Sequence, residues 1–342
     1  MPNPQAHSTP RRRGPALAAL VGGLTASTVA VVLWTGRTKP PDLAAQSSNT
    51  APKPNDPAKA TEVLAAVEKF RAQGEVKKAE TILRAAATDY PEDQSFPLAL
   101  AELLVADRRL SDAYASYEKA LSIGPADALL EFAAGTVANM IGRTDRAIEH
   151  YSAAQAADKA DPRFPLYLAM VQAKKGQIVE AKANLLIAGK LNPDDATVWG
   201  TLADLSLREN AIPLALQHIA KARDLEPEAT VWRVIEARAF KRGNKPEQAL
   251  GVLIGLSPMQ RLEDGVLSTM GECYGLLGRP EDATKIYREA VDLQPLDGAL
   301  TLEYARWLER SGQLQEALSM AKRSVTLLAP GAAEVVTRLE GK

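Results

Sequence analysis

Small and apolar side chains recur along this chain with a period of 34 residues. Alanine occupies one position of this period in eight consecutive segments, and other apolar positions lie at fixed distances from it. A period of this length is typical of a helical solenoid, in which each repeat buries its apolar face only by stacking on its neighbours. The pattern therefore predicts an elongated, all-helical protein that holds other molecules. The eight alanines are Ala79, Ala113, Ala147, Ala181, Ala215, Ala249, Ala283 and Ala317.

Other positions that recur within the period predict two closely packed helices per repeat. With the recurring alanine numbered as position 20, positions 8 and 27 are also mostly small, which lets two helices approach closely. Position 24 is bulky and would fill the space between the helices. The position 24 residues are Leu83, Tyr117, Tyr151, Leu185, Ile219, Leu253 and Tyr287.

Two further positions predict where the helices end. Position 15 is glycine or asparagine in seven of the eight repeats, with Arg108 as the exception. These residues tolerate the left-handed backbone that follows a helix. Position 32 is proline in five repeats, which would end the second helix and direct the chain into the next repeat. Each repeat is thus predicted to be a helix of about three turns, a tight turn and a second helix.

This pattern resembles the tetratricopeptide repeat (TPR) family. Repeat seven matches the family's motif best, and the similarity extends over residues 60–331. Repeats six and eight lack the proline at position 32, and Leu256 replaces the small residue at position 27. The resemblance implies a right-handed superhelical solenoid of about eight repeats, within residues 59–330. The motif residues of repeat seven are Leu267, Gly271, Tyr274, Gly278, Ala283, Tyr287, Ala290 and Pro295.

The predicted repeats have regular bounds, and a short helix follows the last of them. Val335, Val336 and Leu339 have helical spacing in residues 331–342, which predicts a capping helix over the last open face. The repeats are 60–93, 94–127, 128–161, 162–195, 196–229, 230–263, 264–297 and 298–331.

The N-terminal part predicts a single membrane span. Residues 15–36 contain no charged side chain, and Arg37 follows them. The apolar stretch Ala16–Trp34 within this segment is long enough to cross a bilayer as a helix. Arg11, Arg12 and Arg13 in the basic leader, residues 1–14, favour a cytoplasmic N-terminus. We therefore expect a single-pass protein of the bacterial inner membrane with its repeats in the periplasm. The alternative is a cleaved signal peptide ending near Thr28-Val29-Ala30, but the apolar stretch continues past that site.

Residues 37–58 are expected to be a linker. The segment is rich in proline and serine, cannot bury a core and favours an extended, semi-rigid spacer. Asp56 and Pro57 would cap and begin the first helix of the repeats.

Composition and the few reactive side chains argue against catalysis, cofactors and nucleic acid. The formal net charge of −1 provides no basic field for nucleic acid. Cys273 is the single cysteine and is expected to be a buried packing residue, which excludes an internal disulfide. His150 and His218 share position 23, two repeats apart, so we expect them on the outer side of their helices and too distant to share a metal. We expect no cofactor, no metal site and no enzymatic activity.

The resemblance places the binding groove on the first helices, mainly at positions 2, 5, 9, 12 and 13. In this chain these positions are apolar in repeats two to four and basic in repeats five to eight, where Lys241 and Arg310 also lie. Such a groove suits peptides with apolar anchors and some negative charge. Half-exposed leucines and arginines that face helix ends would give the same pattern without a ligand. The predicted groove residues are Leu98, Phe132, Asn139, Leu166, Met170, Arg238, Arg242 and Arg306.

Three functional classes follow from these features. The first is a membrane-tethered scaffold or adaptor that binds protein segments and assembles or escorts envelope proteins. The second is a non-catalytic accessory subunit of a membrane biogenesis machine, such as one for cytochrome maturation, secretion or polysaccharide export. The third, an enzyme, is disfavoured because no acid–base residues converge at a motif. The sequence leaves the partner and the oligomeric state open.

Overall fold

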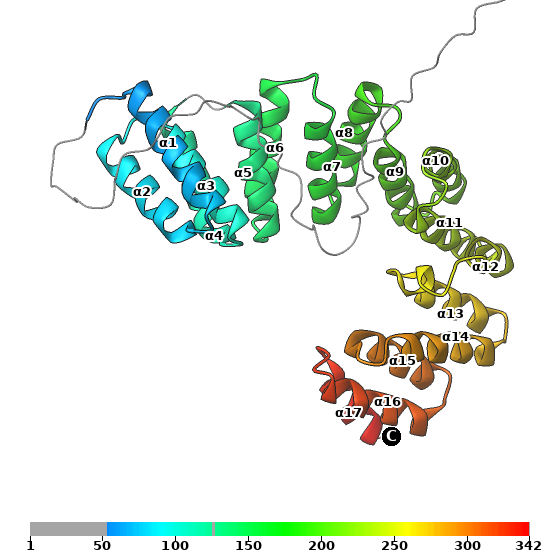
Figure 1. Ribbon diagram of the computed structural model, residues 1–342. Helices are drawn as coiled ribbons and strands as arrows, with labels where there is room; N and C mark the ends of the chain where they lie inside the picture. Colours follow the sequence, from blue (N-terminus) through cyan, green and yellow to red (C-terminus); the bar gives the residue numbers. More distant parts are fainter. Residues whose placement is uncertain (1–52, 125–126, 342) are drawn as a thin grey trace, which may run out of the picture. The chain divides into compact units, whose positions relative to one another are not determined.

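The chain folds as successive α-helices. A computed structural model describes residues 53–124 and 127–341, and these residues form helices and turns without a β-strand (Figure 1). The all-α prediction is confirmed. The helices are α1 (Pro57–Ala72), α2 (Val76–Asp89), α3 (Ser95–Ala106), α4 (Leu110–Ile123), α5 (Ala128–Met140), α6 (Thr144–Ala157), α7 (Arg163–Lys175), α8 (Ile178–Leu191), α9 (Ala196–Arg208), α10 (Ile212–Leu225), α11 (Thr230–Arg242), α12 (Pro246–Leu253), η1 (Gln260–Leu262), α13 (Val266–Leu276), α14 (Pro280–Leu293), α15 (Gly298–Arg310), α16 (Leu314–Thr326) and α17 (Ala332–Glu340).

The helices form two compact units. Helices α1 to α10 belong to the first, and α11 to α17 belong to the second. In both units an odd-numbered helix packs against the even-numbered helix that follows it, and each such pair packs on the next pair of its unit. We call α1, α3, α5, α7, α9, α11, α13 and α15 the first helices, and the even-numbered helices their second helices. Neighbouring first helices also contact each other, as α1 does with α3 and α11 with α13.

The turn inside every pair has a left-handed residue where the sequence predicts one. All eight position 15 residues have positive φ, including the non-glycine residues Arg108, Asn210 and Asn244 at 59°, 60° and 56°. The left-handed residue lets the chain reverse immediately after the first helix, and the next amide then returns to a carbonyl of the helix end. Arg109 N, for example, donates to Leu104 O at 2.9 Å.

Small side chains hold the two helices of each pair together. Each of the eight recurring alanines has a relative exposure of 0%. The bulky residues at position 24 are buried beside them, among them Tyr151 and Tyr287 at 0%. The close approach of backbones therefore depends on side chains of one carbon, and the large side chains fill the remaining volume of each layer.

Both ends of the described helical region have defined contacts. Asp56 caps α1, because its Oδ1 accepts hydrogen bonds from Ala58 N at 3.1 Å and Lys59 N at 3.2 Å. At the other end, α17 buries Val335 and Leu339 against the last pair. The residues 1–52, with the predicted leader, membrane span and most of the linker, lie outside the described residues. Within the described residues, no helix is long and apolar enough to span a bilayer.

Repeat six departs from a regular pair. Its second helix, α12, has only eight residues and ends at Leu253, and η1 occupies the chain before α13. Gly251 and Gly255 weaken the helix here, and Ser257-Pro258 prevents its continuation. Leu256, which takes the place of the small residue at position 27, therefore follows α12 rather than lying in it, and it is buried at 2% exposure.

Alanine substitutions at two glycines of the second unit are expected to change its stability in opposite directions. Neither Gly278 in the α13–α14 turn nor Gly251 in α12 has an atom within 4 Å of an added Cβ, but Gly278 has φ of +68°. Gly278→Ala is expected to destabilise the unit by roughly 1–2 kcal/mol, because a left-handed backbone disfavours a Cβ. Gly251→Ala is expected to stabilise it by about 0.5–1 kcal/mol, since alanine loses less entropy in a helix. Hydrogen exchange of peptides from this unit in the full chain measures both, and equal signs would contradict the assignment of these backbones.

Candidate binding site on the first-helix face

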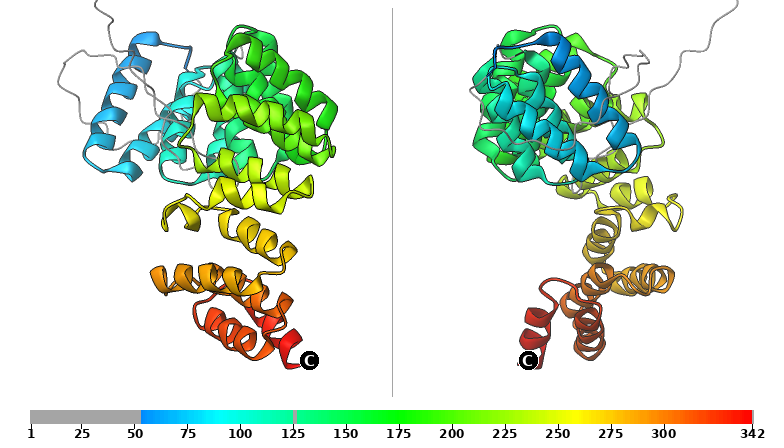
Figure 2. Two further views of the ribbon diagram at one scale, coloured as in Figure 1. Left: turned by 90° about the vertical axis from the view of Figure 1, so that its right-hand side faces the viewer. Right: turned by 60° about the vertical axis from the view of Figure 1, so that its left-hand side comes forward.

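Three consecutive first helices of the second unit line a pocket of about 480 Å³. Lys241 lies at the end of α11, Leu276 ends α13, and Trp307 and Arg310 lie on α15. These helices follow one another within the unit (Figures 1 and 2). Gly275 shapes the pocket, because a Cβ at this position would lie 3.4 Å from the Trp307 ring. The ring can therefore lie close to the backbone of α13.

A rigid aromatic cluster underlies the pocket. Trp307 is 5% exposed, and its Nε1–H donates to Thr284 Oγ1 at 3.2 Å. Its ring stacks on Tyr287 with centroids 6.1 Å apart, and Tyr287 stacks in turn on Tyr304 at 5.9 Å. The side chain of Trp307 thus belongs mainly to the core and forms the pocket's floor.

The rim of the pocket combines an exposed apolar side chain with cations. Leu276 is 60% exposed, although it is a large apolar residue. The Arg310 guanidinium lies 5.8 Å from the Trp307 ring centroid, and Lys241 forms an ion pair with Glu272. The site can therefore accept an apolar group on Leu276 beside a carboxylate near Arg310.

A carboxylate beside this cluster is held at an energetic cost. Burial raises the pKa of Glu303, even though the Tyr287 hydroxyl donates to its Oε1 at 2.9 Å and Arg310 favours its charged form. Burial is thus the largest influence on this carboxyl group, and the donor from Tyr287 and the charge of Arg310 oppose it. A ligand that adds a positive charge here would compete with Arg310, whereas an anionic ligand would pair with it.

Three of the predicted groove residues lie in this unit but outside the pocket. Arg242 and Arg306 are exposed, and Arg238 is half-buried. Arg238 occupies the space beside Gly265, where an added Cβ would lie 2.3 Å from its Nη2. Lys241 and Arg310, which the sequence also assigns to the groove, do line the pocket. The groove prediction did not include three further lining residues, although they occupy groove positions 9, 12 and 13 of repeat seven. These are Glu272, Gly275 and Leu276.

The other five predicted residues lie on the first helices of the first unit. Leu98 and Met170 are half-buried against the core, and Leu166 is 7% exposed, so little of its side chain is accessible. Phe132 belongs to an aromatic cluster, with ring centroids 5.4 Å from Tyr151 and 5.0 Å from Tyr167. These apolar side chains thus pack mainly between consecutive repeats and expose little surface to a ligand.

Asn139 differs from its apolar neighbours because it carries an unused acceptor. Its Oδ1 is buried and has no hydrogen-bond partner among the described residues. A buried polar atom without a partner is costly, and because this oxygen is enclosed by the protein it offers no surface to a ligand.

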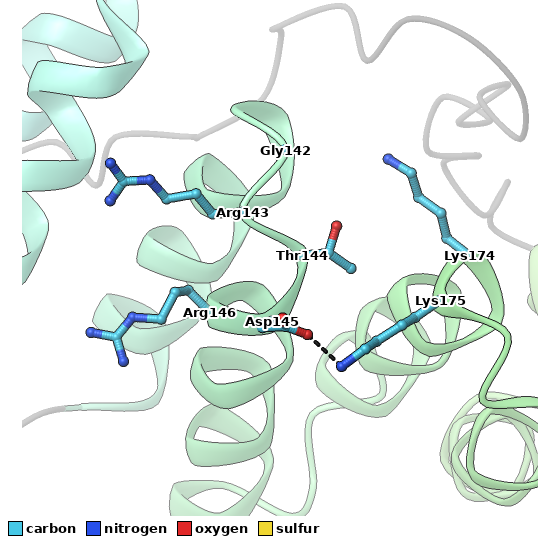
Figure 3. Close-up of a pocket in the computed structure, with 7 residues that line it drawn as sticks. All are labelled: Gly142, Arg143, Thr144, Asp145, Arg146, Lys174 and Lys175. Carbon is cyan, nitrogen blue, oxygen red and sulfur yellow. Dashed lines mark hydrogen bonds and ion pairs between the residues drawn. The ribbon is translucent and has the colours of Figure 1, made fainter.

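A second pocket, of about 530 Å³, lies at the α5–α6 turn beside the end of α7, but its cations do not converge. Arg143 and Arg146 point away from Lys174 and Lys175 (Figure 3). Arg146 pairs with Glu118 and Glu149, and Lys175 pairs with Asp145. Arg146 and Lys175 are thus paired within the protein, and Arg143 lies over the Tyr114 ring at 4.9 Å, so the cations do not form a prepared anion site.

The expectation that His150 lies on the outer side of its helix is wrong. His150 is 8% exposed; its Nδ1 lies 2.7 Å from Glu131 Oε2 and its Nε2 lies 2.9 Å from Glu118 Oε1. It links α4, α5 and α6. The physical reason is the close approach of α6 to α5 at Gly135, where an added Cβ would lie 2.9 Å from the Tyr151 ring and 3.1 Å from the His150 Cβ; at this separation the imidazole reaches Glu131 on α5 and Glu118 on α4.

The remaining reactive side chains have packing environments. Cys273 is fully buried, as predicted, and burial raises the pKa of its thiol to about 11. His218 is half-buried; burial lowers its pKa, and its Nδ1 lies 3.3 Å from Ser206 Oγ. Among the described residues, no group of three or more histidine, cysteine, aspartate or glutamate side chains could hold a metal ion.

Comparison with known proteins identifies the same repeat along most of the chain. Tetratricopeptide repeat family models match residues 64–128, 98–162 and 142–205, and a model described as Psidin, N-terminal TPR repeats region, matches residues 206–326. No curated protein matches the sequence.

Solved structures share the fold at low sequence identity. A tetratricopeptide repeat protein from Parabacteroides merdae ATCC 43184 has 14% identity and a TM-score of 0.59, covering 72% of this chain and 98% of that one. The APC/C hetero-tetramer Cut9-Hcn1 has 12% identity and a TM-score of 0.52, covering 83% and 57%. PilF of Pseudomonas aeruginosa has 18% identity and a TM-score of 0.50, covering 63% and 98%. At these identities the likeness concerns the fold.

Proposed function

Because this chain belongs to the tetratricopeptide repeat family, whose helix pairs form protein-binding scaffolds, we propose that it is a non-catalytic, membrane-tethered scaffold that binds segments of other proteins on its first helices. Its partners are protein or peptide segments with an apolar anchor and an acidic side chain. The bound proteins are envelope proteins, which the scaffold assembles or escorts.

The pocket between α11, α13 and α15 carries this proposal. Leu276 is exposed beside two cationic side chains, Lys241 and Arg310, and lies over a rigid aromatic floor. An apolar anchor gains most from burial on a preformed surface, because the protein loses little entropy on binding. A neighbouring carboxylate of the ligand would pair with Arg310, which is exposed on α15 and whose guanidinium lies 5.8 Å from the Trp307 ring centroid.

The tether is proposed from the sequence alone. Ala16–Trp34 has the length of a membrane span, and Arg11, Arg12 and Arg13 precede it. In this arrangement the repeats lie in the periplasm, and residues 37–58 hold them away from the bilayer. Reporter fusions at both ends of the full chain test the topology, and a reporter that places the repeats in the cytoplasm would reject it.

Two leucines of the second unit give a matched test of the binding site. Leu276→Asp removes the apolar rim of the pocket and places a carboxylate near Arg310, so partner recovery is expected to fall roughly tenfold or more, as for a central interface residue. Leu296 is 82% exposed and does not line the pocket, so Leu296→Asp is the control and should leave recovery unchanged. Recovery is measured by crosslinking the full chain in cells and quantifying the captured proteins by mass spectrometry.

The outcomes separate binding from folding. Both variants should keep the circular dichroism spectrum of the native chain, since both side chains are exposed. Equal recovery with Leu276→Asp and with the native chain would move the binding surface elsewhere. Recovery of cytosolic proteins alone would reject the envelope assignment.

A further inference from the structure

The second helix of repeat four, α8, is apolar on the side that faces water. Its inner side buries Ala181, Leu185 and Ala188, as the repeat requires. Its outer side carries an exposed stripe of five further apolar residues, which we call the α8 stripe. These are Val179, Ala183, Leu186, Ile187 and Leu191, and the four large ones are exposed by 77%, 53%, 41% and 39% respectively.

The repeat itself does not explain this stripe. The same positions, 18, 22, 25, 26 and 30, are mainly polar in other second helices. In α2 they are Lys77, Thr81, Arg84, Ala85 and Asp89, and in α14 they are Glu281, Lys285, Arg288, Glu289 and Leu293. Large apolar side chains on the outer side of a second helix take no part in the packing of the repeat, and a contiguous exposed group of them is typical of an interaction surface. The α8 stripe therefore indicates a contact with another molecule.

Two charged residues on the same side of α8 indicate what that molecule is. Glu180 and Lys190 are exposed, and neither forms an ion pair among the residues that the structure describes. They lie five residues before and five residues after Leu185, at opposite ends of the stripe. If a second α8 lies antiparallel to the first, with a two-fold axis beside Leu185, Glu180 of each copy faces Lys190 of the other.

The same register aligns the apolar residues. Val179 then faces Leu191 of the second copy and Ala183 faces Ile187, while Leu186 faces the half-buried Asn184. In a two-fold antiparallel arrangement α10 would face α10 of the second copy, and α10 exposes Leu214 and Leu225, each by 37%. Both the charges and the apolar residues are thus self-complementary, as an isologous interface requires.

We propose that this chain forms a two-fold symmetric dimer through the α8 stripe, with reciprocal Glu180–Lys190 ion pairs. One helix pair is a small contact compared with the roughly 1,600 Å² of a standard stable interface, so the dimer is reversible and depends on concentration. An anionic bilayer fits the same surface less well, because helices that lie on such a membrane carry mainly lysine and arginine beside their apolar side. Glu180 is adjacent to the stripe and would be repelled.

Charge reversal tests both the surface and the register. Lys190→Glu places a carboxylate opposite Glu180 at both ends of the contact, and Glu180→Lys places two lysines together. Each single variant is expected to raise the dimer dissociation constant roughly tenfold or more, because facing like charges disfavour association. The Glu180→Lys/Lys190→Glu double variant restores opposite charges and should return the dissociation constant to within about threefold of the native value.

Mixing the two single variants provides the sharpest result. A heterodimer of Glu180→Lys with Lys190→Glu has two attractive pairs, so the mixture should associate more strongly than either variant alone. Sedimentation velocity of the full chain over a range of concentrations measures this, with every sample in the same buffer and detergent. Lys119→Glu is the control, since Lys119 is exposed on α4 in the same unit, and it should leave the dissociation constant unchanged.

Two results would overturn the proposal. A native chain that stays monomeric at every soluble concentration would leave the α8 stripe to a different protein or to a lipid surface. A dimer that responds to neither single variant, or that the double variant fails to restore, would contradict antiparallel pairing through α8.

Discussion

Replacing Tyr287 with alanine is expected to destabilise the unit formed by α11 to α17 by about 3–5 kcal/mol, as is typical for truncating a buried aromatic side chain. Tyr287 is 0% exposed and lies between the rings of Tyr304 and Trp307. Its removal would leave a cavity under the pocket, and the neighbouring rings cannot fill it without leaving their present packing. Urea unfolding of the full chain, with hydrogen exchange of peptides from this unit, measures the loss.

Tyr287→Phe separates the ring from the hydroxyl. The ring packing stays, so the cost is expected to be smaller, about 1.5–3 kcal/mol for a lost hydrogen bond to a charged acceptor. Burial already raises the pKa of Glu303 above its ordinary value of 4.5, and the Tyr287 hydroxyl opposes that rise. Without the hydroxyl the folded-state pKa should rise further.

The sign of the pH effect follows from this shift. A carboxyl group whose pKa is raised in the folded state binds more protons when folded than when unfolded, so stability falls as pH increases above 4.5 towards the folded-state pKa. The deficit of Tyr287→Phe relative to the native chain should therefore be larger at pH 7 than at pH 4. A deficit that is equal at both pH values would mean that Glu303 does not depend on this donor.

Replacing Ala215 with leucine is expected to destabilise the first unit by roughly 1–3 kcal/mol through overpacking. Ala215 is one of the eight recurring alanines and is 0% exposed between α9 and α10. A larger side chain must push the two helices apart or leave its preferred rotamer. Ala220→Leu is the control, because Ala220 is exposed on the same helix, and its effect should stay within about 0.5 kcal/mol. Equal thermal midpoints for the two variants would contradict the assigned helix contact.

The repeat and its turns could be predicted because they depend on local requirements that recur every 34 residues. A tight turn after a first helix needs one left-handed residue, and the chain places a residue with positive φ there even where it is Arg108. A close helix pair needs a small side chain, and Ala215 and its equivalents provide it. These requirements act between residues that are near one another in sequence, so their pattern is visible without coordinates.

The binding pocket could be predicted only in part. Sequence positions brought Lys241 and Arg310 to the groove, but Leu276 and the backbone at Gly275 become a site only because the Trp307 ring packs against α13 from the next repeat. Arg238, by contrast, was predicted to line the groove, but its guanidinium lies beside Gly265 and outside the pocket. Which side chain is accessible depends on contacts between repeats, and a single repeat's motif does not contain them.

The sequence by itself thus determined the helical class, the repeat, the turns and the residues that hold each pair together, because those features arise from backbone conformation and side-chain volume over short distances. Only the tertiary structure decided that His150 lies buried between Glu118 and Glu131, that Arg238 lies beside Gly265, and that the α8 stripe is left uncovered. Each of these depends on how neighbouring helices pack in space, which a single repeat's sequence does not contain.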